Sequence, residues 1–306
     1  MNLLTRLKCE RLVRRVRRGK RKDPAVQQFF NAHGIFFLPK NCHAALPTVA
    51  EIERAFEYRG EAPPFLDPAL FRHERMTSFL EELLPFAREF RAPLKDEGGG
   101  GASFFWENRF FEWSDALAYY AILRRFRPQR VLEVGSGFST LVAAAALAKN
   151  GSGELICVEP SPRPFLSRAQ GVKELIRKEV QELPLAFFQE QLRDGDVLFI
   201  DSSHTVKTGS DCVYLYLKVL PYLKARLFIH SHDIFLPDAL PRDWQTQKHF
   251  YFTEQYLLLA LLLESPRFEV LYGTQYHRRM NAERLAEFNR PHSRPEGTSF
   301  WYRRIP

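Results

Sequence analysis

From about residue 114 onward, short hydrophobic runs alternate with longer amphipathic segments. The runs of strand length lie at 130–134, 154–159, 173–180, 196–200, 226–229, 268–271 and 298–303. The segments with helical spacing lie at 114–126, 138–149, 164–170, 206–220 and 250–264, with a short helix from Pro184. This alternation predicts an open, mostly parallel sheet covered by helices on both faces. In such sheets ligands bind outside the carboxyl ends of the strands.

The N-terminal part has a different pattern. Residues 48–58 and 72–91 have helical spacing, and Gly34–Leu38 reads as a short strand or a buried turn. Four consecutive glycines at 98–101 disfavour any regular element and mark a boundary. We therefore expect a tail over residues 1–22, a mainly helical cap region over 23–102 and the sheet-bearing domain over 103–306.

Charge separates the tail from the body. The 306 residues carry a net charge of +8, but residues 1–22 alone hold ten Lys or Arg against one acid, Glu10. The body is therefore close to neutral, which argues against a specific nucleic-acid partner. As a helix, the tail would not carry a single apolar stripe, so we expect a flexible solvated arm. The alternative is weak electrostatic contact with an anionic membrane surface or another polyanion.

Location follows from three observations. Charges interrupt the first residues before an apolar signal region can form, and the longest apolar run, Tyr256–Leu263, is too short to span a bilayer. The four cysteines show no C-x-x-C spacing, which suits a reducing compartment. We expect a cytoplasmic protein, with contact at the inner face of the membrane as the alternative.

A glycine turn follows the first strand of the sheet. Gly135 and Gly137 separate Val131–Val134 from a helix, so backbone N–H groups at 135–140 can approach a ligand closely. The next strand ends in Glu159, whose carboxylate can accept hydrogen bonds from both hydroxyls of a ribose. The pattern predicts a site for a nucleoside-containing cofactor.

Two classes of cofactor compete for this site. A dinucleotide fingerprint needs G-x-G-x-x-G, and here Thr140 takes the place of the third glycine. Glu133, two residues before the turn, would repel a pyrophosphate but attract an ammonium group. S-adenosyl-L-methionine carries an ammonium and no phosphate, so we favour it. A nucleotide-dependent oxidoreductase remains the alternative enzyme, and a non-catalytic binding or scaffold protein the alternative outside enzymes.

A second polar group follows the fourth and fifth strands. These strands end in Asp201-Ser-Ser-His204 and His230-Ser-His232-Asp233, which meet at one rim if the strands are neighbours. Asp201, His232 and Asp233 are candidate ligands of Mg²⁺ or another divalent cation, which would lower the pKa of a substrate hydroxyl. Alternatively, His204 or His232 takes the proton directly as general base. A Ser-His-Asp triad is disfavoured because the chain has no G-x-S-x-G.

The order of these motifs over residues 104–304 carries a resemblance. Glu133-x-Gly-x-Gly137, Ile200–Asp211, His232–Pro237, Glu254–Leu257 and Thr298–Trp301 resemble a bacterial family of class I S-adenosylmethionine-dependent methyltransferases. That family is related to O-methyltransferases that use a metal at the ends of the fourth and fifth strands. The resemblance implies a Rossmann-like sheet of seven strands with an antiparallel last strand.

The resemblance also implies roles for particular residues. Cofactor contacts are expected at the turn and at the end of the second strand: Glu133, Gly135, Ser136, Gly137, Ser139, Thr140 and Glu159. Catalysis is expected from Asp201, His204, His232 and Asp233, and metal binding from Asp201, His232 and Asp233. The acceptor would be a hydroxyl on a small molecule or glycan. Thr253 replaces an expected asparagine and Asn41–Ala45 replaces a His/Tyr-rich segment, so the acceptor can differ from those of relatives.

Overall fold

The computed structural model describes residues 3–18, 28, 32–34, 43–96, 103–263, 265–290 and 294–305. The chain divides into two units, Met1–Val49 and Ala50–Pro306. The first unit contains α1 (Leu3–Arg18), so most of the segment expected as a solvated arm is helical, with Leu4 and Leu7 exposed. The segments expected at Gly34–Leu38 and at the glycine run lie largely outside the described residues.

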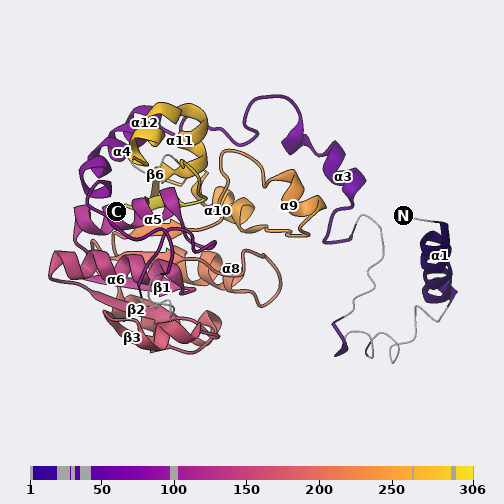
Figure 1. Ribbon diagram of the computed structural model, residues 1–306, viewed down its shortest axis with the longest axis horizontal. Coiled ribbons are helices and arrows are strands. Elements are labelled where there is room, and N and C mark those ends of the chain that lie inside the picture. Colours follow the sequence, from indigo (N-terminus) through magenta and orange to yellow (C-terminus); the bar gives the residue numbers. More distant parts are fainter. Residues whose placement is uncertain are drawn as a thin grey trace. The chain divides into compact units, whose positions relative to one another are not determined.

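The second unit is built on one seven-stranded sheet (Figure 1), with the strand order β3-β2-β1-β4-β5-β7-β6. The strands are β1 (Arg130–Val134), β2 (Glu154–Val158), β3 (Val172–Ile176), β4 (Val197–Ile200), β5 (Phe228–Ser231), β6 (Phe268–Gly273) and β7 (Phe300–Arg304). The first five strands pair in parallel, and β7 runs antiparallel to both β5 and β6. This confirms the predicted Rossmann-like sheet with an antiparallel last strand.

Helices cover both faces of the sheet, among them α4 (His73–Ala87), α5 (Trp113–Phe126), α6 (Phe138–Asn150) and α10 (Glu254–Leu262). The other helices are α3 (Val49–Arg54), α7 (Leu185–Gln191), α8 (Asp211–Tyr214), α9 (Arg242–Thr246), α11 (Thr274–Met280) and α12 (Ala282–Phe288). Shorter 3-10 turns lie at Phe56–Tyr58, Pro164–Arg168, Val180–Glu182 and Leu220–Tyr222.

Alternate residues of each strand point to opposite faces and bury two separate clusters. Val131 and Phe199 pack with α4, α5 and α6 on one face, while Leu132 and Ile200 pack with α10 and the 215–219 turn on the other. Both clusters contain strand residues that are fully buried, as expected for parallel strands covered on both sides. The core therefore fixes the strand ends where the predicted site residues lie.

Several element boundaries differ from expectation. The segment 206–220 is not one helix: a loop with a turn at Thr208–Gly209 leads to Ser210, which caps α8, and a π-helical turn, Leu215–Val219, follows α8. The helix expected from residue 114 begins one residue earlier, at Trp113, and the Ser114 hydroxyl donates to Asn289 Oδ1 at 3.0 Å. Among the helices that the structure describes, none is long and apolar enough to cross a membrane.

Candidate functional site

The glycine turn after β1 is packed tightly against the end of β4. Gly135 has a φ of +81°, and a Cβ there would lie 1.7 Å from the backbone oxygen of Asp201. The Gly135 N–H donates to Val158 O at 3.0 Å, and the Asp201 N–H donates to Val134 O at 2.9 Å. Only glycine fits this position, because any side chain would separate the ends of β1 and β4. At Gly137, by contrast, a Cβ would meet nothing within 4 Å.

Glu133 lies beneath this turn rather than at its mouth. Its side chain is fully buried on the α5 and α6 face, where it accepts hydrogen bonds from Thr140 Oγ1 at 2.6 Å and Tyr119 Oη at 3.0 Å. Burial raises its pKa to about 7, although these two hydroxyls oppose the shift. Glu133 therefore lines neither hollow at the turn, and its expected contact with the cofactor stays a prediction.

Thr140 also supports the turn from below. It is fully buried, and its hydroxyl accepts the Gly137 N–H at 3.1 Å while donating to Glu133. The two residues expected to touch the cofactor thus form one buried link between β1 and the start of α6.

Glu159 lies where the sequence predicts it, at the end of β2. Its carboxylate accepts the backbone N–H groups of Ser136 at 3.2 Å and Ser161 at 2.8 Å, one on each oxygen. A carboxylate has about four acceptor positions, so two remain for ligand hydroxyls. The side chain is thus held in a fixed orientation by the glycine turn it faces.

Two hollows meet at Glu159. The larger, of about 490 Å³, extends along the apolar side chains Val158, Pro160 and Val180. The smaller, of about 300 Å³, lies over the glycine turn and includes Ser136, Gly137 and Ser139 in its wall. Gly135, Glu159 and Asp201 line both hollows, so the two form neighbouring halves of one site.

The predicted catalytic side chains converge at the ends of β4 and β5. His204 Nε2 lies 3.3 Å from Asp201 Oδ1 and 3.6 Å from Asp233 Oδ2. His232 Nδ1 lies 3.6 Å from Asp201 Oδ1 and 3.7 Å from Asp233 Oδ1. Both His204 and Asp233 have positive φ values, 57° and 52°, a conformation that non-glycine residues adopt mainly where surrounding structure enforces it. We call these four residues the polar rim.

Two further carboxylates, which the sequence interpretation missed, hold the histidines from behind. Glu254, at the start of α10, lies 2.8 Å from His204 Nδ1. Asp115, on α5, lies 3.2 Å from His232 Nε2. Both are buried. The motif Glu254-Gln-Tyr was visible in the sequence, but nothing near Asp115 points to a histidine 117 positions away.

Asp115 also fixes the segment before β7. Its carboxylate accepts the backbone N–H groups of Thr298 at 2.9 Å and Ser299 at 2.8 Å. The Thr298 hydroxyl in turn donates to Asp233 Oδ1 at 2.9 Å. The orientations of His232 and Asp233 therefore both depend on this segment.

The surroundings of His204 and His232 favour the protonated, cationic form of both rings. Burial opposes their charge, but the surrounding carboxylates prevail: they raise the pKa of His204 to about 10 and that of His232 well above its ordinary value. Burial likewise opposes ionisation of Asp201, yet the two rings hold the pKa of its carboxyl below the usual range. The raised pKa values favour the protonated form of both rings, and the role of general base expected for His204 or His232 stays a prediction.

His230 is not part of the rim. It is fully buried within the sheet, its ring stacks 4.1 Å from that of Phe199, and Nε2 faces Ser299 Oγ at 3.0 Å. Burial lowers its pKa well below the ordinary value, so it is a neutral core histidine.

The expected metal ligands lie together without forming a metal site. The His232 ring contacts Asp115 through Nε2 at 3.2 Å, whereas its Nδ1 lies 3.6 Å from Asp201 Oδ1 and 3.7 Å from Asp233 Oδ1, beyond hydrogen-bonding distance. Within the described ranges, no group of three or more His, Cys, Asp or Glu side chains could hold a metal ion. Metal binding by Asp201, His232 and Asp233, expected from the resemblance for Mg²⁺ or another divalent cation, therefore stays a prediction.

Comparison with known proteins finds a methyltransferase domain in this chain. A family model described as a methyltransferase domain matches residues 132–234, which include the glycine turn, Glu159 and the polar rim. An uncharacterized protein from Archaeoglobus fulgidus is 31% identical over 165 residues, covering 51% of this chain and 74% of that protein. This match shows that the two proteins belong to one family.

Solved structures that are similar to this chain include two methyltransferases in complex with S-adenosylhomocysteine. The O-methyltransferase from Bacillus cereus is 14% identical with a TM-score of 0.37, covering 75% of this chain and 91% of that one. The plantazolicin methyltransferase BpumL is 13% identical with a TM-score of 0.38, and the match covers 76% of this chain and 98% of that one. The family model, the strand order and the glycine turn agree that this chain belongs to the class I S-adenosylmethionine-dependent methyltransferases.

Proposed function

We propose that the protein transfers a methyl group from S-adenosyl-L-methionine to a hydroxyl oxygen of a small molecule or glycan. One observation carries the placement of the cofactor: the fixed carboxylate of Glu159 lies where the two hollows meet. Its free acceptor positions suit the two ribose hydroxyls. Val158, Pro160 and Val180 then offer an apolar slot for the adenine in the larger hollow.

The turn residues have distinct parts in this proposal. Gly135, Ser136, Gly137 and Ser139 lie in the wall of the smaller hollow and would touch the cofactor directly. Glu133 and Thr140 would act from beneath, through the Gly137 N–H that Thr140 holds. Asp201 lines both hollows and also belongs to the polar rim, so it connects the cofactor side to the acceptor side.

The polar rim would activate the acceptor. The cofactor supplies an electrophilic methyl group on a sulfonium; a new O–CH₃ bond forms as the S–CH₃ bond breaks. The acceptor hydroxyl must lose its proton, and we assign the proton to the carboxylate of Asp233, whose side chain is 20% exposed and oriented by Thr298. The cationic rings of His204 and His232 would stabilise negative charge developing on the acceptor oxygen. This assignment needs no metal ion.

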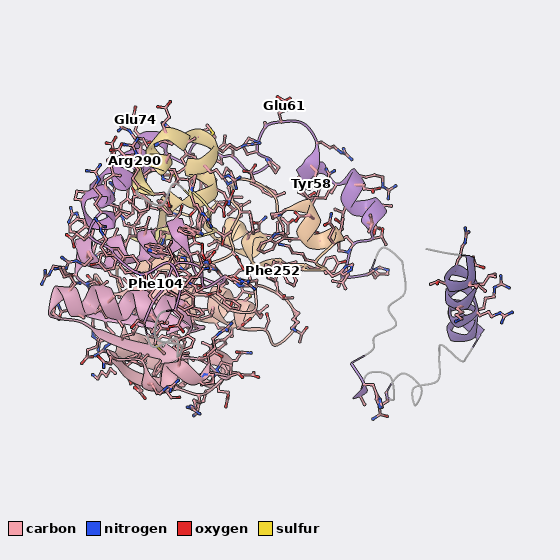
Figure 2. All side chains as sticks on the ribbon, in the orientation of Figure 1. Tyr58, Glu61, Glu74, Phe104, Phe252 and Arg290 are labelled. Carbon is pink, nitrogen blue, oxygen red and sulfur yellow. The ribbon has the colours of Figure 1, made fainter. Side chains whose placement is uncertain are left out.

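Aromatic side chains continue from the rim toward the loop before α10. The ring of Phe252 (labelled in Figure 2) lies 4.7 Å from that of His204, and Trp244 lies 5.8 Å from Phe252. In the cap region, the Tyr58 hydroxyl donates to Leu240 O at 2.7 Å and so ties the cap to the same loop. A surface of this kind suits the face of an aromatic ring or a sugar, which agrees with the acceptor classes expected from the sequence.

Calorimetric titration tests the cofactor assignment. S-adenosylhomocysteine should bind and NADH should not; binding of NADH alone would favour the oxidoreductase alternative, and binding of neither the scaffold alternative. Glu159→Gln removes the anion that faces the ribose and should weaken S-adenosylhomocysteine roughly 10- to 100-fold. Glu174→Gln, on the exposed edge of β3, is the matched control and should leave the affinity unchanged.

Turnover with a panel of phenols and sugars tests the rim. Asp233→Asn should lower kcat about 10²- to 10⁴-fold without changing the affinity for S-adenosylhomocysteine. EDTA should leave the wild-type rate unchanged. Loss of activity with EDTA, restored by Mg²⁺, would contradict the metal-free assignment and support the cation expected from the sequence.

The basic N-terminal segment carries a separate proposal. Exposed Leu4 and Leu7 on α1, together with the Lys and Arg residues of 1–22, suit weak contact with an anionic membrane surface. Co-sedimentation with phosphatidylserine vesicles at low salt should detect binding of the full chain. Deletion of residues 1–22 should abolish it, and failure of the full chain to bind would refute the proposal.

A further inference from the structure

One cationic side chain of the smaller hollow has no assigned function. Arg163, in the loop after β2, lies in the wall of this hollow together with Phe110 and Ser161. Among the residues lining the hollow it is the only Lys or Arg, while Glu159 and Asp201 supply negative charge. The hollow therefore has one positively charged end.

Aromatic rings hold Arg163 in place. Its guanidinium carbon lies 3.9 Å from the centre of the Phe110 ring and 5.9 Å from that of Phe138. The two rings are stacked, with centres 6.0 Å apart and planes at 11°. A cation lying over aromatic faces keeps its N–H groups, which point along its own plane, available for an anion. In the described part of the chain, no side-chain hydrogen bond or ion pair of Arg163 occupies them.

The start of α6 contributes to the same end of the hollow. Ser139 lies in the first turn of this 13-residue helix and lines the hollow. The first N–H groups of a helix lack partners within the helix, and they favour a negative group. Arg163 and the helix start thus converge on one position from different elements.

The proposed cofactor site supplies an anion for that position. With the ribose at Glu159 and the adenine along Val158, Pro160 and Val180, the amino-acid arm of the cofactor extends into the smaller hollow. This arm ends in an α-carboxylate, which suits the planar guanidinium. We propose that Arg163, backed by Phe110, binds the α-carboxylate of S-adenosylmethionine. The inference rests on the proposed function for the position of the ribose.

Two ligands separate the inference from the proposed function. S-adenosylhomocysteine has the carboxylate, whereas 5′-methylthioadenosine keeps the adenine and ribose but lacks the whole amino-acid group. Arg163→Ala should weaken S-adenosylhomocysteine roughly tenfold, as expected for a charge-assisted contact open to solvent, and leave 5′-methylthioadenosine unchanged. Both affinities are measured by calorimetry.

Matched variants make the result specific. Arg168→Ala removes an exposed arginine from the same loop that lines neither hollow, and it should change neither affinity. Phe110→Leu removes the ring beneath the guanidinium and should weaken S-adenosylhomocysteine alone, by less than Arg163→Ala. Because Arg163 and Phe110 are both exposed, thermal unfolding of all three variants should match the wild type.

Three results would overturn the inference. Equal affinity of wild type and Arg163→Ala for S-adenosylhomocysteine would show that the carboxylate lies elsewhere. An equal loss for both ligands would place Arg163 against the nucleoside. If the wild type binds neither ligand, both the proposed function and the inference fail. If the wild type binds both ligands, the proposed function stands, and the affinities of the variants then test the inference alone.

Discussion

Glu133 should make the stability of the protein fall as the pH rises through neutrality. Its carboxyl is fully buried, and its pKa is raised from 4.5 to about 7. A carboxyl with a raised pKa in the folded state stabilises the fold fully below pH 4.5. That contribution is lost as the pH rises through about 7, because the folded protein must then bury the charge.

The magnitude follows from the size of the shift. At 1.36 kcal/mol per pKa unit, a change from 4.5 to about 7 is worth about 3 kcal/mol in total. Most of it, about 2 to 3 kcal/mol, should be lost between pH 5 and 8. Glu133→Gln keeps the shape and the hydrogen-bonding capacity but cannot ionise, so the variant should lack this part of the pH dependence.

Urea unfolding of wild type and Glu133→Gln from pH 5 to 8, at constant ionic strength, measures the effect. The free energy of unfolding of Glu133→Gln, measured relative to that of the wild type, should increase by about 2 to 3 kcal/mol from pH 5 to pH 8. Thr140→Val provides a second check, because it removes a hydroxyl that stabilises the carboxylate and should move the transition to higher pH. A difference between wild type and Glu133→Gln that stays constant within about 0.5 kcal/mol would refute the assignment.

Two further substitutions test the packing of the site by thermal and urea unfolding. Gly135→Ala should cost about 3 kcal/mol or more, since its Cβ would overlap the backbone of Asp201, whereas Gly137→Ala should stay within about 0.5 kcal/mol; equal effects would contradict the tight turn. Asp115→Ala leaves His232 and two backbone N–H groups without their acceptor and should cost about 3 to 5 kcal/mol, with kcat falling more than the affinity for S-adenosylhomocysteine. A stable Asp115→Ala variant with normal turnover would show that the rim needs no such anchor.

The local pattern of apolar and polar residues was sufficient to predict the sheet and the positions of several candidate site residues. The runs around Val131 and Leu198 have the length and apolarity of strands buried on both faces, so strand positions and the parallel arrangement followed. Because carboxyl ends of parallel strands share an edge, the meeting of Asp201 with His232 followed too. Glu159 was recognisable as a candidate because the role we propose for it depends only on where β2 ends.

The features that the sequence did not reveal depend on contacts between residues that are distant in the chain. The burial of Glu133 results from α5 and α6 covering its face of the sheet, and sequence spacing does not show which face is covered or how closely. The sequence predicted the rim histidines at the strand ends, but it did not show that Asp115 and Glu254 lie behind them. The broken helix at 206–220 had a local signal in Ser210, but its apolar spacing outweighed that signal in our interpretation.

The bond between Asp115 and the backbone of Thr298 joins positions 183 residues apart. During synthesis, the glycine turn and the first five strands are therefore made long before the segment that orients His232 and Asp233. A growing chain can therefore pair β1 to β5 before the residues that orient Asp233 exist. Deletion of residues 297–306 would remove Thr298, whose hydroxyl donates to Asp233, together with β7, which pairs with both β5 and β6.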